Sequence, residues 1–324
     1  EEGYEYEREV ALIIKEILRQ RLLGIKNRQG VVVTPAFPKL VYVLDENNCL
    51  QGGKYDYITR DYAIPCSAKR MYPDYISAKQ MRQIYDGNVF SCMGCRSFLS
   101  PWMDENGDVK FEGRFNAGVV SLNLPQIAII SHGDEKKFWR LLDRRLDLCY
   151  EALLCRHKLL KGTKAAVSPI HWQDGAIARL DAEDTIDPLL ENGYCTMSLG
   201  YIGVYEMTKL MIGESHTSEK GQEFALKVMH HLKDTVDRWK AETDIGFGLY
   251  GTPAENLCYR FAKIDKEKFG NIKDITDKGY YTNSYHVDVR EPIDAFSKLA
   301  FESQFQKIST GGCISYIEIP NMQD

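Results

Sequence analysis

The sequence predicts an α/β fold in which parallel strands alternate with helices. Short β-branched or apolar runs, such as residues 195–204 and 247–250, are separated by longer segments whose apolar residues recur at helical spacing. This alternation is typical of parallel sheets covered by helices. The composition is that of a globular protein, with 44% hydrophobic and 27% charged residues. No internal repeat or low-complexity linker divides the chain, so we expect residues 1–324 to form one domain.

The first third of the chain is predicted to begin with a helix and to continue with short strands. Residues 5–23 carry apolar side chains at helical spacing, which predicts an amphipathic helix. Residues 31–34 and 40–44 are β-branched and are broken by prolines, so two short strands, or a strand and a loop, fit them. The pattern then predicts a short helix over 75–85, a loop over 90–100 and a buried strand over 118–122.

The remaining elements follow the same two periodicities. Long Leu-rich segments predict helices, and short apolar runs beside glycine predict strands. The predicted elements are a helix over 138–160, a strand and turn over 195–204, helices over 205–212 and 219–240, a strand over 247–250, a helix over 253–264, a strand over 280–289, a helix over 292–307 and a strand over 313–319.

Charge and cysteine content exclude several classes of protein. The chain has 41 basic and 46 acidic residues, a net charge of -5, and therefore no cationic surplus for nucleic acid or anionic lipid. No apolar run is long enough to span a bilayer, and no signal peptide opens the sequence. The nine cysteines are an odd number in a chain too long for a disulfide scaffold, which favours a reducing cytoplasm.

Cys92 and Cys95 form a C-x-x-C pair, which can bind metal, form a redox disulfide or supply a reactive thiol. Zinc needs four ligands, and the sequence has no second C-x-x-C pair and no H-x3-H pair, so we expect no metal site. Gly94 and Pro101 indicate a loop, which can carry one thiol into a cavity. Two small buried residues in a turn explain the pair equally simply, and the residues alone slightly favour that interpretation.

Three other motifs allow both a structural and a functional interpretation. Thr252-Pro253-Ala254-Glu255 matches a helix capping box, although a helix N-terminus can also bind phosphate. The run 309–313 has two glycines between a predicted helix and strand, which favours a turn whose N–H groups could also meet a phosphate. Asn116 precedes an apolar strand, either as a turn residue or as a polar group aimed into a cavity.

These segments together resemble the anaerobic (class III) ribonucleoside-triphosphate reductases. The resemblance covers nearly the whole chain in the family's order and implies a ten-stranded α/β barrel of two five-stranded parallel halves with a central finger loop, present here as a partial barrel. It is carried by CMGCRSFL at 92–99, GRFNAGVVSLNLP at 113–125, GTPAENLCYRFAKID at 251–265, KGYYTNSYHVDVRE at 278–291 and AFSKLAFESQFQKISTGGCISYIEIPNM at 295–322.

The resemblance also implies roles for individual residues. Cys95 matches the finger-loop cysteine whose thiyl radical removes the ribose 3′-hydrogen, and Met93 matches the methionine beside it. Asn116 matches the asparagine that binds the ribose hydroxyls or the reductant, whereas Cys92 is not the radical carrier. A flexible thioether and a small glycine suit the crowded tip of such a loop. For the triphosphate, the candidates are Thr252, Glu255, Asn256, Thr310, Gly311 and Gly312.

The family further implies formate as reductant, a glycyl radical, a radical-SAM iron–sulfur activase, dNTP and ATP effectors, and a homodimer in the cytoplasm. The family's ATP-cone region, effector site, second catalytic cysteine, zinc site and glycyl radical loop are not found in this sequence. We therefore expect a barrel fragment that cannot turn over alone. Two alternatives remain at this point: another glycyl radical enzyme, of the formate-lyase type, or a barrel fragment that only binds.

Overall fold

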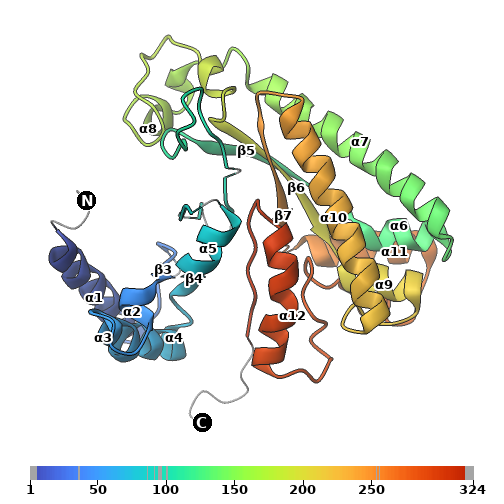
Figure 1. Cartoon of the computed structure of the whole chain (residues 1–324), viewed down its shortest axis with the longest axis horizontal. Coiled ribbons are helices and arrows are strands. Elements are labelled where there is room, and N and C mark those ends of the chain that lie inside the picture. The colour runs from blue at the N-terminus through green and yellow to red at the C-terminus, as the bar shows by residue number, and fades with distance from the viewer. Residues whose placement is uncertain are drawn as a thin grey trace. The chain divides into compact units, whose positions relative to one another are not determined.

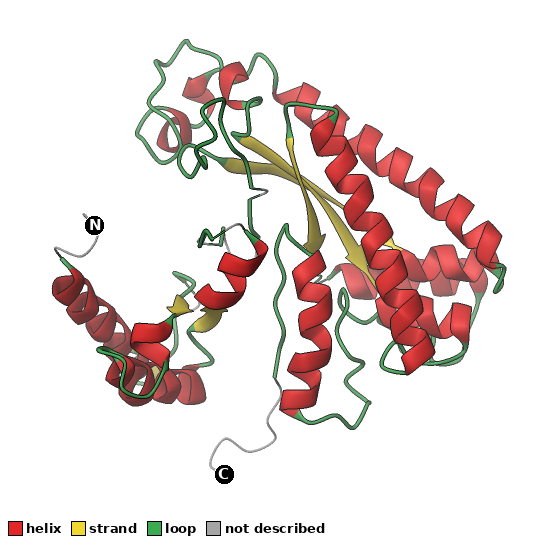
Figure 2. Cartoon of the chain, viewed as in Figure 1, coloured by secondary structure: helices red, strands yellow, loops and turns green. Residues whose placement is uncertain are grey.

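The computed structural model describes residues 6–35, 37–85, 87–90, 92–93, 97–99, 101–252, 254 and 256–317. The chain divides into two compact units, one of residues 1–90 with 319–324 and the other of residues 91–318. Both contain helices and parallel strand pairs, which confirms the predicted α/β class (Figures 1 and 2). The described residues form one three-stranded and two two-stranded sheets, and these do not close into a ten-stranded barrel.

The first unit is built around one parallel strand pair. Strand β3 (Val41–Leu44) pairs in parallel with β4 (Asp74–Ser77), and three short α-helices and one π-helical turn (Thr59–Ala63) connect them. An antiparallel pair, β1 (Ile25–Lys26) and β2 (Val32–Val33), follows the first helix. The helices of this unit are α1 (Glu7–Leu23), α2 (Glu46–Cys49), α3 (Asp56–Ile58), α4 (Ile64–Arg70) and α5 (Ala78–Ile84).

The predicted helix over 75–85 is wrong in its first part. Residues 74–77 form strand β4, and the helix α5 begins only after Ser77, whose hydroxyl accepts a hydrogen bond from the Gln80 N–H at 3.3 Å. The serine is therefore an N-cap, which satisfies one of the helix's unpaired N–H groups. In residues 75–77, pairing with β3 therefore outweighs the helical spacing of the side chains.

The second unit contains a parallel sheet in the order β5-β6-β7, with β6 in the centre (Figure 1). Its strands are β5 (Phe115–Asn123), β6 (Cys195–Ile202) and β7 (Gly246–Gly251). Its helices are α6 (Leu124–Ser131), α7 (Glu135–Leu160), α8 (Pro169–Trp172), α9 (Val204–Ile212), α10 (Glu219–Ala241), α11 (Leu257–Phe269) and α12 (Ala295–Ile308). None of these described helices is both long and apolar enough to cross a membrane.

One face of this sheet is apolar and is covered by helices. Successive side chains of a strand point to opposite faces, so Met197, Leu199 and Tyr201 share a face, and all three are fully buried. They belong to one hydrophobic cluster with Leu142 of α7 and Leu232 of α10. Helices α7 and α10 lie side by side over this face (Figure 2). Burial of this face supplies the main hydrophobic stabilisation of the unit.

Residues 280–289 do not form the strand that their apolar pattern predicts. Their backbone follows turns past α9, where the Thr282 N–H donates to Glu206 Oε1 at 2.7 Å. The Lys278 ammonium lies 2.6 Å from Glu206 Oε1 and 2.6 Å from Asp288 Oδ2, and all three side chains are at most 4% exposed. Arg290 also pairs with Asp288, at 2.8 Å. A buried ion network therefore fixes this segment, and ladder hydrogen bonds do not.

The predicted strand over 313–319 is also not formed in its described part, residues 313–317. The other predicted helices and strands are present with shifted ends. Helix α6 was not predicted, because its apolar run reads as an extension of the strand before it. Asn123 caps this helix by accepting a hydrogen bond from the Gln126 N–H at 3.1 Å.

We predict that Lys278→Met destabilises the protein by about 3–5 kcal/mol, because it leaves the Glu206 carboxylate buried without a cation and leaves Asp288 with Arg290 alone. Urea unfolding measures the loss. The control is Lys161→Met, which removes an exposed ion pair to Glu191 of 3.1 Å and should cost less than about 1 kcal/mol. Equal losses in the two variants would contradict a structural role for the network.

Candidate active site

The second face of the β5-β6-β7 sheet carries a group of small and polar residues, beside Val119 and Tyr250. Strand β6 is buried along its whole length, so this face is also inside the protein. The strand register places Asn116 beside Thr196 and Thr196 beside Gly246, and it places Ser198 beside Gly248. We call this the polar face, and its residues are Asn116, Ser121, Thr196, Ser198, Gly200, Gly246 and Gly248.

Asn116 is held in a fixed orientation at the start of β5. The strand has a register shift between Asn116 and Gly118, and the Gly118 N–H donates to Asn116 Oδ1 at 2.9 Å. The Asn116 amide Nδ2 donates to Ser198 Oγ at 2.6 Å. An amide has two N–H donors and two acceptor lone pairs. One donor and one lone pair of this half-buried side chain thus remain for a bound hydroxyl or carboxylate.

Two hydroxyls meet over a glycine near the carboxyl ends of the strands. Ser121 Oγ and Thr252 Oγ1 are 3.0 Å apart, and Thr252 is 8% exposed. A Cβ atom on Gly200 would lie 2.0 Å from Thr252 Oγ1 and 2.4 Å from Ser121 Oγ. The position therefore requires glycine so that the two hydroxyls can meet above the central strand.

We predict that Gly200→Ala destabilises the protein by about 1–3 kcal/mol, because the added methyl overpacks this contact. Equilibrium unfolding of single and double variants tests the cause. Thr252→Ala removes the nearer hydroxyl, so the double variant should lose less stability than the sum of the two single losses. Strictly additive losses would show that the hydroxyl contact does not determine the requirement for glycine.

The loop that carries the C-x-x-C pair closes on itself beside the sheet. The Met93 N–H donates to the Ser97 carbonyl at 2.7 Å, and the Ser97 N–H donates back at 3.3 Å. Met93 packs against a cluster that contains Phe115 and Cys195, the first residues of β5 and β6. The structure thus brings Met93 close to the strand position before Asn116. The predicted radical carrier, Cys95, lies outside the described residues.

The far end of the loop is attached to the glycine turn that follows α12. The Phe98 N–H donates to the Gly311 carbonyl at 2.9 Å, and the Gly311 N–H donates to the Leu249 carbonyl at 2.7 Å. The Gly251 N–H donates to the Gly312 carbonyl at 2.9 Å. A Cβ on Gly248 would lie 2.9 Å from the Gly311 Cα. The turn therefore lies against β7 and connects the loop to the sheet.

The N–H groups of this turn already have acceptors inside the chain. Thr310 donates its N–H to the Ile308 carbonyl at 3.0 Å, and Gly312 donates its N–H to the Ser309 carbonyl at 3.1 Å. Gly311 donates to β7, as described above. In this arrangement the turn supports the loop, and its backbone offers no N–H group to a phosphate.

The predicted capping box is wrong. Helix α11 begins at Leu257 with Asn256 as its N-cap, whereas Thr252 lies four residues before that cap and binds Ser121. Pro253 and Glu255 lie outside the described residues. The Asn256 side chain is exposed and makes no capping hydrogen bond. The first N–H groups of α11 therefore lack a side-chain cap, and an uncapped helix start favours anions.

Sequence reasoning missed Ser198, Ser121 and Thr196. Thr196 Oγ1 is buried and has no hydrogen-bond partner within the part of the chain that the structure describes. A period-two reading of T-x-S-x-G at 196–200 would have shown a strand with one polar face. That signal was hidden because the other face of the same strand is strongly apolar.

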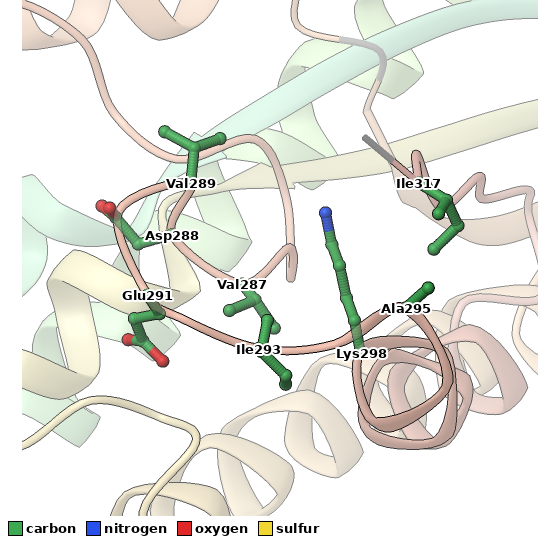
Figure 3. Close-up of a pocket in the computed structure, with 8 residues that line it drawn as sticks. All are labelled: Val287, Asp288, Val289, Glu291, Ile293, Ala295, Lys298 and Ile317. Carbon is green, nitrogen blue, oxygen red and sulfur yellow. The ribbon is translucent and has the colours of Figure 1, made fainter. Parts of the chain in front are cut away.

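A pocket of about 160 Å³ lies elsewhere in the second unit. Lys298 of α12 extends toward it in Figure 3. None of the predicted site residues that the structure describes lines it. Among the described residues, no group of three or more His, Cys, Asp or Glu side chains is placed to hold a metal ion. The lining residues are Val287, Asp288, Val289, Glu291, Ile293, Ala295, Lys298 and Ile317.

Comparison with known proteins gives one consistent result. The family model described as "Anaerobic ribonucleoside-triphosphate reductase" matches residues 2–324. The enzyme of that name from Enterobacteria phage T4 is 47% identical over 97% of this chain and 51% of its own length. The enzyme from Escherichia coli is 43% identical over 97% of this chain and 44% of its own length. The chain thus spans about half the length of these curated relatives.

Solved structures show the same fold. The anaerobic ribonucleotide reductase from Thermotoga maritima in complex with dATP and CTP has a TM-score of 0.64 at 18% identity, covering 93% of this chain and 45% of that one. The same enzyme with MES in the active site has a TM-score of 0.66, covering 98% of this chain and 48% of that one.

Proposed function

Because the chain belongs to the anaerobic ribonucleoside-triphosphate reductase family, we propose that it carries the ribose site of an enzyme that converts ribonucleoside triphosphates to 2′-deoxyribonucleoside triphosphates. The observation that supports this most is the orientation of Asn116. Its amide is fixed by Gly118 and Ser198 on a buried polar face, with Met93 packed close by. The family match also favours this activity over a formate-lyase type of reaction.

The proposed chemistry uses a cysteine radical and formate. A glycyl radical elsewhere in the full-length protein would supply the radical chemistry, by accepting the hydrogen atom of the Cys95 thiol. The thiyl sulfur would take the hydrogen atom from C3′, so that an S–H bond forms and a C3′ radical is left, and the 2′-hydroxyl would leave with one proton as water. Formate would supply two electrons and the hydrogen gained at C2′ and become carbon dioxide, and the S–H hydrogen would return to C3′, which restores the thiyl radical. Overall, the nucleotide, one formate and one proton give the deoxynucleotide, carbon dioxide and water. The Asn116 amide would bind a ribose hydroxyl or the formate carboxylate through its remaining donor and acceptor.

The polar face suits this reaction because its β6 residues are buried and offer neutral hydrogen-bonding groups. The residues in register with Asn116 across the sheet, Thr196 and then Gly246, are uncharged. Ser198 orients the amide, and the hydroxyl of Thr196 is a further donor for a ligand on this face. Preorganised donors of this kind need no rearrangement when the substrate binds.

For the triphosphate we propose the N-terminal end of α11. This helix follows β7, and ligands of parallel sheets bind beyond the carboxyl ends of strands. Asn256 makes no cap bond, so the helix start can receive a phosphate, with Thr252 and Glu255 nearby in the sequence. Gly311 and Gly312, with Thr310, are proposed to contribute only if their N–H groups change partners on binding.

The wider assembly is proposed from the family alone. We propose that the full-length protein closes the ten-stranded barrel, forms a homodimer in the cytoplasm and responds to dNTP and ATP effectors. A radical-SAM iron–sulfur activase would generate the glycyl radical. The dATP and CTP named for the Thermotoga maritima structure fit an effector and a substrate of this type.

We predict that Cys95→Ser in the full-length protein abolishes formation of deoxyribonucleotide from ribonucleoside triphosphate and formate, because an alkoxyl radical cannot form under the same activation. An anaerobic assay measures product, and unfolding temperature checks the fold. Cys92→Ser is the matched control and should keep turnover, because Cys92 is not the radical carrier. Loss of turnover in Cys92→Ser with retention in Cys95→Ser would overturn the assignment.

A further inference from the structure

The segment between the C-x-x-C loop and β5 is a tightly bonded hairpin. Met103 and Val109 form an antiparallel bridge. The N–H groups of Asn106 and Asp108 both donate to Asp104 Oδ1, each at 2.9 Å, which closes the turn. These bonds leave the hairpin few ways to move internally. Its position relative to the sheet therefore depends on contacts at its base.

The base of the hairpin is attached to the strand edge through Arg114 and Trp102. The buried Arg114 Nε donates to the Gly193 carbonyl at 2.7 Å. The Trp102 indole packs directly on the same glycine, since a Cβ there would lie 2.1 Å from Trp102 Cγ. Gly193 has a φ of 75°, which also favours glycine. Trp102 is thus held on one side by the backbone before β6.

Lys240, in the last turn of α10, holds the other side. Its ammonium donates to the Pro101 carbonyl and lies 5.5 Å from the centre of the Trp102 ring. The end of α10 is firmly packed, because the neighbouring Trp239 is 3% exposed and stacks on Tyr150 with ring centres 5.0 Å apart. The lysine therefore connects a rigid helix to the two residues that follow the loop.

This cation occupies an unfavourable place. Within the described residues it forms no ion pair, and burial together with the nearby Arg114 guanidinium lowers the pKa of the Lys240 ammonium. A half-buried ammonium without a carboxylate partner costs free energy. Lys233, two turns earlier on the same helix, pairs with Asp237 in the ordinary way. Residues that cost stability in this way are found mainly at functional sites.

We propose that Lys240 is a positioning residue for the C-x-x-C loop, holding the loop's base through the Pro101 carbonyl and the Trp102 ring. Phe98, bonded to Gly311, provides a second attachment nearer the tip. Phe98 and Pro101 are thus two fixed points on the part of the loop that leads to β5. A displacement of about 1 Å at a reacting group can cost a hundredfold in rate. The effect of Lys240 on turnover rests on the proposed function, whereas the attachment of the loop does not.

The first test measures the loop and does not depend on turnover. In the full-length protein, iodoacetamide alkylation of Cys95 is followed by peptide mass spectrometry, with the exposed Cys155 as internal reference. Lys240→Met should raise the Cys95 rate about tenfold, the scale of a lost charge-assisted hydrogen bond. Lys240→Arg and the control Lys233→Met should react like the wild type.

Two results would overturn the proposal. One is an unchanged Cys95 rate in Lys240→Met. The other is a parallel rise at the buried Cys149 and Cys195, which would show general loosening of the fold. If Lys240→Met does not fold, Lys240→Gln replaces it, because glutamine keeps a donor for Pro101 and removes the charge. An unchanged Cys95 rate in that variant, with the fold intact and Lys240→Arg also unchanged, counts against the cationic contact.

The second test is turnover of ribonucleoside triphosphate. Lys240→Met should lower kcat about tenfold to a hundredfold with little change in KM, while the yield of glycyl radical on activation stays the same. A wild-type protein that shows no turnover, with Cys95 still exposed by Lys240→Met, would refute the proposed function and leave the attachment intact. A raised KM with unchanged kcat would contradict a positioning role.

Discussion

Burial of the central strand on both faces is the constraint from which the rest of the second unit follows. Strand β6 has no solvent-exposed residue, so each polar atom on it needs a partner and each bulky side chain needs space. On the helix-covered face, Met197, Leu199 and Tyr201 fill the space. On the polar face, Ser198 takes the Asn116 amide as its partner. Glycines at 200, 246 and 248 allow neighbouring segments to approach closely.

The same constraint explains why segments distant in sequence meet at one place. The turn at 310–312 lies against β7 because Gly248 has no side chain to keep it away. The Gly311 carbonyl of this turn then accepts a hydrogen bond from the Phe98 N–H, which anchors the C-x-x-C loop. The ion network around Lys278 acts at the carboxyl ends of the strands, where Ser284 Oγ donates to the Thr252 carbonyl at 3.1 Å. The site is thus supported at the loop and at the strand ends.

The sequence predicted the fold class and most helices because long apolar periodicities determine them. It failed where a tertiary partner overrides a local pattern. Residues 280–289 have the composition of a strand. Their backbone instead follows the bond from the Thr282 N–H to Glu206 and the ion pair of Lys278 with Asp288. Thr252 has the local sequence of a helix cap, yet its hydroxyl forms a hydrogen bond with Ser121, which is distant along the chain. Neither partner can be found from neighbouring residues.

The roles of the candidate site residues stay predictions. The motifs that surround Met93 and Asn116 located the region, because a family resemblance preserves order along the chain. The hydrogen bond from Asn116 to Ser198 and the contact of Lys240 with Pro101 join residues far apart in sequence, and no spacing rule gives them. Such pairings require the strand register and the helix ends to be known.

A crystal structure of the full-length protein, grown without oxygen and with a bound ribonucleoside triphosphate, tests the central claim most directly. We expect the sugar to lie against the sheet surface that carries Asn116 and Ser198, with C3′ next to the Cys95 sulfur. A nucleotide bound far from that surface, with protein side chains filling the space above Ser198, would contradict it.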